Sequence, residues 1–303
     1  MANRILVIGS LNMDLVVRAP RHPQVGETII GSEFSTFPGG KGANQAVAAA
    51  RLGAPVTMIG KVGADAFGAE LLQTAARDGV DVQWIGRDPG AATGVALITV
   101  SESGQNTIVV ASGANARLTP ADLDAAKAAF AEAAVLLLQL ESPLDVVQHA
   151  VELARAQGVP VILNPAPAQP LPDELLRMVD TLMPNQTELL QISGQPDLES
   201  AVQVLLDLGV RQLIVTLGEE GALLAAGQTR EKLPAFKVTA VDTVAAGDAF
   251  VGAYATARAE GKNTSEAARF ASAAAAISVT RVGAQPSLPT REEVEQFLNE
   301  NHG

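Results

Sequence analysis

The chain has 303 residues, 48% of them hydrophobic, which suits one large α/β domain or two ordinary ones. Its formal net charge of −12 argues against nucleic acid as a partner, because phosphate backbones need a basic patch. The absence of cysteine excludes disulfides, thiolate catalysis and cysteine-bound zinc or iron–sulfur centres. The histidines, His22, His149 and His302, are scattered along the chain, and we interpret them as surface or loop residues rather than ligands.

The hydropathy of the chain also limits its location. No stretch reaches the ~18 uninterrupted apolar residues of a membrane span. The apolar run near the N-terminus is too short for the core of a signal peptide. The sequence therefore predicts a cytoplasmic protein with no membrane partner.

Strand-like and helix-like patterns alternate along the chain. Short apolar runs predict strands buried on both faces, and apolar residues at helical spacing predict helices between them. The predicted strands are 4–9, 56–60, 135–140, 161–163, 181–183 and 212–217. The predicted helices are 43–52, 66–78, 120–132, 144–157, 198–208, 250–258 and 267–277. This alternation predicts a single α/β domain over residues 1–303, built on a doubly wound, mainly parallel sheet flanked by helices.

Two segments, at about 15–37 and 92–111, interrupt the alternation. The first is polar and punctuated by Gly and Pro. The second has strand-like runs at 94–100 and 107–110 around a turn-like stretch, which predicts a β-hairpin. Because neither segment leads directly into a helix, we expect a small antiparallel β-sheet apart from the main one.

Polar side chains follow two of the predicted strands. Asn12 and Asp14 come after the first strand, and Glu141 comes after the strand that ends near residue 140. In open α/β sheets ligands bind outside the carboxyl ends of the strands, so Asn12 and Asp14 are placed to bind sugar hydroxyls. Turn formation is the alternative role for Asn12 and Asp14. The exposed start of a helix before Pro143 is the alternative for Glu141.

The stretch from Asp242 to Phe250 combines small residues with a carboxylate. Ala245, Ala246 and Gly247 allow a ligand to approach the first turn of the following helix, where unpaired N–H groups and the helix dipole favour negative charge. Such a site suits a transferring phosphoryl group, and Asp248 is placed to accept a proton from an attacking hydroxyl. A helix N-cap is the alternative role for Asp248, and the spacing alone does not decide between the two.

Two motifs resemble the signatures of the ribokinase family of sugar and nucleoside kinases. The first is Pro-Gly-Gly-Lys-Gly-Ala-Asn-Gln at 38–45, which is neither a Walker A loop nor a Gly-x-Gly-x-x-Gly fingerprint. The second is Asp-Thr-x-Ala-Ala-Gly-Asp at 242–248. The resemblance implies ATP-dependent phosphorylation of D-ribose at its 5-hydroxyl. Kinases of deoxyribose, fructose or a nucleoside are the alternatives, followed by a non-catalytic sugar or nucleotide sensor on the same fold.

The resemblance also implies a role for each candidate residue. Asp248 becomes the catalytic base, and the amides around Ala245, Ala246 and Gly247 form the anion hole. The implied sugar-binding residues are Asn12, Asp14, Gly40, Lys41, Gly42, Asn44, Glu141 and Asp248. The implied nucleotide-site residues are Asn185, Glu188, Thr216, Gly218, Gly221, Gly247 and Ser272. Asn185 and Glu188 are expected to organise Mg²⁺, with Glu188 acting through water, and the acidic residues Glu219 and Glu220 are expected to face solvent.

A bound K⁺ and a homodimer are further implications of the resemblance. The implied K⁺ ligands, mostly carbonyl oxygens, belong to Asp242, Val244, Ser278, Arg281, Gly283 and Ser287. The small sheet is implied to be a lid over the sugar and to pair with its copy in a second chain. Two residues depart from the family pattern. Ser272 replaces an Asn that often lies near the adenine, and Ala249 replaces a hydroxyl residue that often follows the catalytic Asp.

Overall fold

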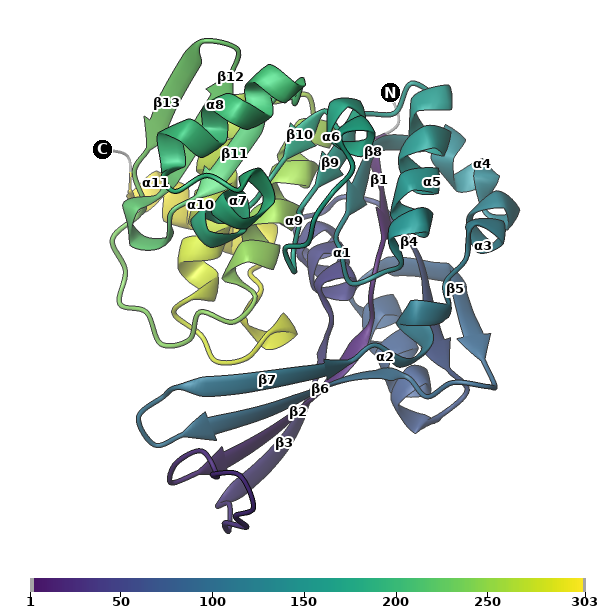
Figure 1. The fold of residues 1–303 in the computed structure, drawn as a ribbon, viewed down its shortest axis with the longest axis vertical. Coiled ribbons are helices and arrows are strands. Elements are labelled where there is room, and N and C mark those ends of the chain that lie inside the picture. Colours follow the sequence, from purple (N-terminus) through teal and green to yellow (C-terminus); the bar gives the residue numbers. More distant parts are fainter. Residues whose placement is uncertain (1–2, 302–303) are drawn as a thin grey trace.

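The structure is a computed structural model that describes residues 3–301, and a nine-stranded sheet forms its centre (Figure 1). The strand order is β13 (Thr229–Leu233), β12 (Ala222–Ala226), β11 (Leu213–Thr216), β10 (Thr181–Leu182), β9 (Val161–Leu163), β8 (Ala133–Leu138), β1 (Arg4–Ile8), β4 (Val56–Gly63) and β5 (Val80–Asp88). Every pair from β11 to β5 is parallel, whereas β12 and β13 pair antiparallel at one edge. The predicted doubly wound, mainly parallel sheet is confirmed.

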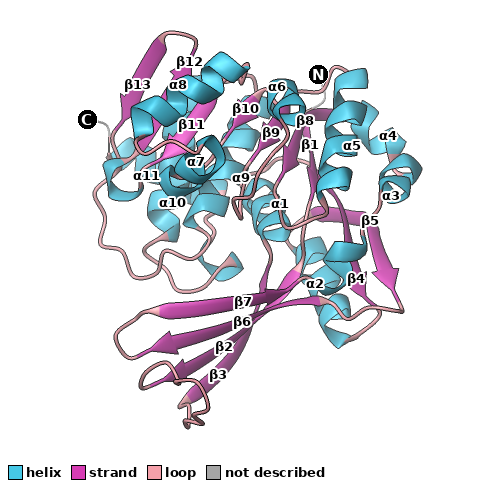
Figure 2. Cartoon of the chain, in the orientation of Figure 1, coloured by secondary structure: helices cyan, strands magenta, loops and turns pink. Residues whose placement is uncertain are grey.

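Helices cover both faces of this sheet (Figure 2). One face carries α1 (Lys41–Arg51), α2 (Ala66–Arg77), α9 (Ala246–Ala259), α10 (Thr264–Ser278) and α11 (Arg291–Glu300). The other carries α3 (Pro120–Ala125), α4 (Lys127–Ala131), α5 (Leu144–Ala156), α6 (Asp173–Met178), α7 (Gln186–Ser193) and α8 (Leu198–Leu208). The single helix predicted over 120–132 is two short helices, because the backbone at Ala126 leaves the helical region.

The central strands are buried on both faces, as their unbroken apolar runs predict. Successive side chains of a strand point to opposite faces. In β1, Ile5 and Val7 therefore join the core beneath α1 and α9, while Leu6 and Ile8 join the core beneath α5. The loops after these strands are held at one edge of a rigid sheet.

Helices α1 and α9 pack unusually closely, and this contact positions the candidate site. A Cβ added at Gly252 on α9 would lie 2.7 Å from both the Ala48 Cβ and the Gln45 carbonyl oxygen on α1. Only glycine allows this approach. The first turns of the two helices, which carry Asn44 and Asp248, are thereby brought side by side.

A four-stranded sheet projects from the body below the main sheet (Figure 1). Its order is β3 (Glu33–Gly39), β2 (Asn12–Ala19), β6 (Gly94–Ser101) and β7 (Asn106–Ala111). The two outer pairs are antiparallel, as predicted, and the central pair β2 and β6 is parallel. The predicted hairpin between 94–100 and 107–110 is confirmed.

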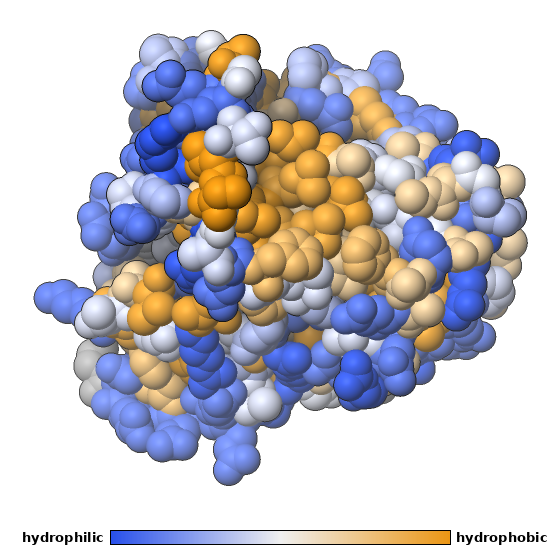
Figure 3. All heavy atoms as spheres, turned by 90° about the horizontal axis from the view of Figure 1, so that it is seen from below, coloured by the Kyte–Doolittle hydropathy of each residue, from blue (hydrophilic) through white to orange (hydrophobic). Residues whose placement is uncertain are grey.

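The two faces of this small sheet differ in character. Asp14 lies in line with Ala96 and Val110 on the face that turns toward the body. On the opposite face, Phe34 is 62% exposed and Val109 is 66% exposed. Figure 3, which views the molecule from the side of this sheet, shows apolar side chains gathered there.

Within residues 3–301, no helix combines the length and apolar character needed to cross a bilayer.

Candidate active site

The candidate residues meet at the carboxyl ends of neighbouring strands β1 and β8. From β1 the chain crosses to β4 on one side, while β8 and β9 extend the sheet on the other. Such a change in strand order leaves a crevice in which open α/β sheets bind ligands. Asn12 follows β1, Glu141 follows β8, and both line the same cavity.

The carboxylate of Asp248 is buried and held by two amides. Its Oδ2 accepts from Asn44 Nδ2 at 3.0 Å, and its Oδ1 accepts from Gln45 Nε2 at 2.9 Å. Ala245, not Asp248, is the N-cap residue of α9. The structure therefore places Asp248 against α1 rather than in the capping role that the sequence left open.

The turn before Asp248 presents free backbone amides. Ala245 adopts a left-handed conformation with φ of 60°, which non-glycine residues rarely adopt. The amides of Gly247 and Asp248 lie in the first turn of α9, and none of residues 3–301 accepts a hydrogen bond from them. A Cβ added at Gly247 would meet nothing within 4 Å, so this turn faces open space. The amides and the helix dipole together favour an anion here.

The glycine-rich loop is clamped between β1 and Glu141. Glu141 Oε2 accepts from the Lys41 amide at 3.1 Å and also from the Ser10 hydroxyl. A Cβ at Gly40 would lie 2.7 Å from the Asn12 amide nitrogen, and Gly40 has φ of 88°. Gly42 likewise has no room for a Cβ, which would lie 2.6 Å from the Ser10 amide nitrogen. The glycines thus allow backbone contact that fixes where Lys41 and Asn44 point.

Four carboxylates, those of Asp14, Glu141, Glu188 and Asp248, and the ammonium group of Lys41 act on one another at this site. Burial, reinforced by Glu141 and Asp248, raises the pKa of Asp14 to about 7, and Lys41 opposes the shift. The pKa of Lys41 is raised above its ordinary value, first by the charge of Asp248 and then by Glu141 and Glu188. Carboxylates therefore outnumber ammonium groups at this site. A ligand whose hydroxyl groups donate hydrogen bonds to these carboxylates is favoured here.

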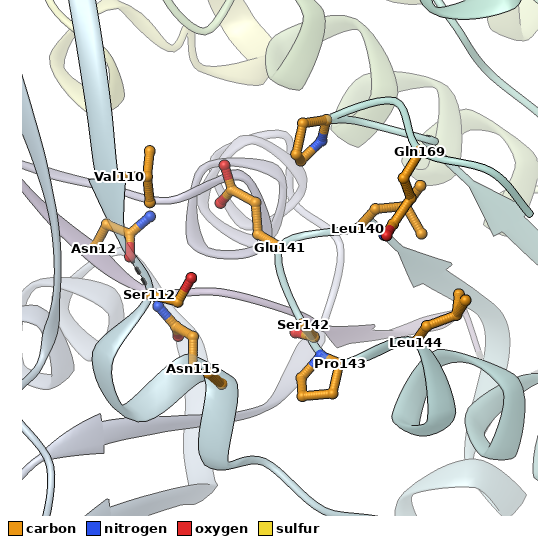
Figure 4. Close-up of a pocket in the computed structure, with 12 residues that line it drawn as sticks. Asn12, Val110, Ser112, Asn115, Leu140, Glu141, Ser142, Pro143, Leu144 and Gln169 are labelled. Atoms are coloured by element: carbon orange, nitrogen blue, oxygen red, sulfur yellow. Dashed lines mark hydrogen bonds between the residues drawn. The ribbon is translucent and has the colours of Figure 1, made fainter. Parts of the chain in front are cut away.

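A cavity of about 340 Å³ opens beside these groups (Figure 4). Its lining includes Glu141, Ser142 and Gln169, and Asn12 and Ser112 lie next to each other at one side of it. Within the part of the chain that the structure describes, Asn44 Oδ1 and Ser142 Oγ are buried without a hydrogen-bond partner. Buried polar atoms normally find partners, so both atoms are free to bind a polar ligand.

The predicted nucleotide-site residues gather at the ends of β10 and β11. Asn185 and Glu188 form a capping box on α7, in which Glu188 Oε2 accepts from the Asn185 amide at 2.8 Å. Asn185 also forms an isolated bridge with Thr216. Partial burial raises the pKa of Glu188, and Lys41 and Asp248 act on it electrostatically, so the capping box lies near the carboxylate cluster.

The remaining predicted nucleotide residues lie in a turn and a nearby helix. Gly218 and Gly221 form the turn between β11 and β12, with Glu219 and Glu220 exposed as predicted. Ser272 is half-buried on α10, which packs against β12. At the other departure from the family pattern, Ala249 is fully buried in the core.

The predicted K⁺ ligands come together in the loops that flank α9 and α10. Asp242 Oδ1 accepts from the Val244 amide at 2.9 Å, and its Oδ2 accepts from the Gly283 amide at 2.9 Å. Ser278 Oγ and Ser287 Oγ are 2.8 Å apart. The guanidinium of Arg281 pairs instead with Glu293, so any contribution of Arg281 to a cation site is through its backbone.

Several residues of this site were not assigned from the sequence. Asn115 Nδ2 donates to Asn12 Oδ1 at 2.8 Å, while its Oδ1 accepts from the Leu11 amide. Gln45, Gln139 and Asn164 form a chain of buried amides beside Asp248. Asn164 directly follows β9, so the rule that placed Asn12 and Glu141 at strand ends could have found it. Asn115 lies in a short 3-10 helix, η1 (Gly113–Arg117), and carries no such signal.

The scattered histidines lie away from these groups. His149 on α5 contacts Asp124 at 3.0 Å, and His22 lies in the segment between β2 and β3. His302 lies outside the described residues.

Comparison with known proteins identifies the family. The model of the pfkB family of carbohydrate kinases matches residues 2–291. The chain belongs to this family. A ribokinase of Haemophilus influenzae is 43% identical over 303 residues, which cover 98% of this chain and 99% of that protein. A deoxyribokinase of Salmonella typhimurium is 38% identical over 303 residues, covering 98% and 99%.

A solved pfkB-family structure agrees with the fold. The structure of Arabidopsis thaliana ribokinase complexed with ribose and ATP is similar with a TM-score of 0.91 and 35% identity. The similarity covers 98% of this chain and 99% of that one. The predicted family and the predicted ribokinase-like fold are therefore confirmed.

Proposed function

We propose that this protein transfers the γ-phosphoryl group of ATP to the 5-hydroxyl of D-ribose. The observation that carries the proposal is the buried Asp248 carboxylate beside the free amides of the α9 turn. The sugar-binding groups Asp14, Asn44 and Glu141 come from separate elements to the same place. The similarity to ribokinases, one of which is described as complexed with ribose and ATP, supports ribose as the acceptor.

The arrangement supports the following roles for the chain's own groups. Asp248 accepts the proton of the attacking hydroxyl, and its two amide partners keep it oriented. The free amides of Gly247 and Asp248, in the turn that follows Ala245, stabilise negative charge on the transferring phosphoryl group, whereas the Ala246 amide already donates to the Thr243 carbonyl oxygen at 3.3 Å. Asp14 and the unpartnered Asn44 Oδ1 accept from sugar hydroxyls, which fixes the sugar for in-line attack.

Magnesium fits the capping box of α7. One oxygen of Glu188 binds the Asn185 amide, and its other oxygen makes no protein hydrogen bond among the described residues. Mg²⁺ prefers oxygen ligands and keeps several waters, so this carboxylate suits a water-mediated site. When bound, Mg²⁺ neutralises charge on the phosphate oxygens.

A panel assay for ADP release tests the proposed function. Ribose is expected to give a higher kcat/KM than deoxyribose, fructose or adenosine. Sites built to hydrogen-bond a hydroxyl disfavour analogues that lack it, because buried polar groups then stay unpaired. Deoxyribose is the sharpest competitor, since a deoxyribokinase is among the relatives.

Other outcomes of the panel would redirect the assignment. Preference for deoxyribose, fructose or adenosine would replace ribose while leaving a kinase. Ribose binding by calorimetry without ADP release from any sugar would favour a non-catalytic sensor.

We also propose that K⁺ occupies the loops joined by Asp242. The Asp242 carboxylate binds the amides of Val244 and Gly283, and it therefore ties the loop before the α9 turn to the loop after α10. Exchanging K⁺ for Na⁺ or Li⁺ at fixed ionic strength is expected to lower turnover while the melting temperature stays nearly unchanged. Equal turnover in the three salts would remove the monovalent cation from the proposal.

The small sheet is proposed to act as the lid and the dimer interface. Its Asp14 face closes over the cavity, where Val110 is one of the lining residues. Its other face carries the exposed Phe34, Leu97 and Val109, which a second copy would cover. Light scattering is expected to give a dimer for the wild type and a monomer for Leu97→Glu, and a monomeric wild type would refute the interface.

A kinase that uses ATP is expected in the cytoplasm, which cell fractionation tests.

A further inference from the structure

A chain of buried amide side chains lies behind Asp248. Gln45 Nε2 donates to Asp248 Oδ1 at 2.9 Å and to Asn164 Oδ1 at 3.0 Å. Gln45 Oε1 accepts from Gln139 Nε2 at 2.6 Å. Gln45 is 0% exposed and Gln139 is 1% exposed, so water does not compete for these bonds. The amides form a fixed support for one oxygen of the carboxylate.

One backbone group sets the direction of the whole chain. Asn164 Nδ2 donates to the Met183 carbonyl oxygen at 2.8 Å, and a carbonyl oxygen can only accept. Asn164 must therefore turn its oxygen toward Gln45, and Gln45 must turn its nitrogen toward Asn164 and Asp248. A flipped Gln45 would place its oxygen against two acceptors and its nitrogen against the Gln139 donor. Gln45 is thus held with both N–H groups committed.

We propose that Gln45 is a positioning residue for phosphoryl transfer, which keeps the Asp248 carboxylate aimed at the sugar hydroxyl. The inference rests on the proposed function and assigns a role to a residue that contacts the base rather than the substrate. Asn44 binds the other oxygen at 3.0 Å, so the two donors fix the plane of the carboxylate. Its remaining lone pairs stay available for the substrate proton.

Substitution of Gln45 by Met tests this role. Gln45→Met keeps the length of the side chain but removes both N–H donors. We expect kcat to fall roughly 10- to 100-fold, the scale of a lost hydrogen bond to a charged group. The KM values for ribose and ATP are expected to stay within about threefold, because the interaction acts on the base in the transition state.

Gln212→Met is the matched control. Gln212 is another amide with three side-chain hydrogen bonds, to Thr181, Tyr254 and Thr264, and it lies just before β11 at the opposite end of the strands. Its replacement is expected to lower the melting temperature to a similar degree without changing kcat. If the two variants have equal melting temperatures and kcat falls equally in both, the positioning role is overturned.

A second readout does not depend on turnover. In a crystal structure of Gln45→Met, the Asp248 carboxylate is expected to turn out of the plane that it has in wild type, because only Asn44 still donates to it. An unchanged carboxylate orientation, or kcat within about twofold of wild type, would overturn the proposal. If the wild type phosphorylates no sugar, the proposed function fails, and the orientation of the carboxylate still decides whether Gln45 positions Asp248.

Discussion

Asp248→Asn is expected to lower kcat for ribose by at least ~10²-fold, the usual scale of general-base catalysis. The variant keeps the shape of the side chain but cannot accept a proton at neutral pH. Asn44 and Gln45 both donate to Asp248. The amide nitrogen of the new asparagine will therefore face one of these donors, and that hydrogen bond will be lost. Steady-state kinetics should show a much smaller change in the KM values for ribose and ATP.

Asp197→Asn is the control for a purely structural carboxylate. Asp197 caps α8 by accepting from the Ser200 amide at 3.0 Å, so its replacement is expected to affect the melting temperature slightly and kcat not at all. If Asp248→Asn behaves like this control and turns over at nearly the wild-type rate, Asp248 is not the base.

The sequence predicted the central strands and the polar residues at their ends for simple physical reasons. Strands β1 and β8 lie between neighbours and beneath helices on both faces, so they must be continuously apolar. Asn12 and Glu141 then break an apolar run where the chain leaves the sheet, and this break is visible without any tertiary information.

Most of the elements that the sequence missed bury few side chains, although β12 buries four of its five residues. Strand β13 reads Thr-Arg-Glu-Lys-Leu at the edge of the sheet, and none of its residues is buried. Strand β5 forms the other edge and alternates irregularly between buried and open positions. Helices α7 and α11 each bury a single residue, Leu189 and Val294. A hydrophobic pattern cannot identify an element that contributes so little to the core.

The partners of Asp248 also could not be predicted from the sequence. Gln45 was visible within the glycine-rich motif, but its contact with Asp248 depends on the close approach of α1 and α9 at Gly252. Nothing near Gln45 in the chain signals that approach. Family resemblance could name the base, whereas only the fold shows what orients it.

Asp14→Asn is expected to raise the KM for ribose at least ~10-fold while leaving the KM for ATP nearly unchanged, because a lost charged acceptor weakens sugar hydroxyl binding. The structure raises the pKa of Asp14 to about 7, mainly through burial and then through Glu141 and Asp248. In the wild type, kcat/KM for ribose is therefore expected to fall as pH drops below about 7 and Asp14 gains a proton. In Asp14→Asn, the fall in kcat/KM caused by protonation of Asp14 should be absent, which kinetics from pH 5.5 to 8.5 would reveal.

The same substitution is expected to stabilise the sugar-free protein at high pH. The pKa of Asp14 is about 7 in the folded chain and about 3.9 in an unfolded one. Between these values the folded state binds more protons, so the contribution of Asp14 to stability falls as pH rises from about 4 to about 7. Above that range the folded protein carries an unfavourable buried charge, which asparagine removes. We expect Asp14→Asn to raise the free energy of unfolding at pH 8 by on the order of 1–3 kcal/mol and to change it little near pH 4. If the variant has a lower free energy of unfolding than wild type at pH 8, Asp14 stabilises the folded state instead of destabilising it.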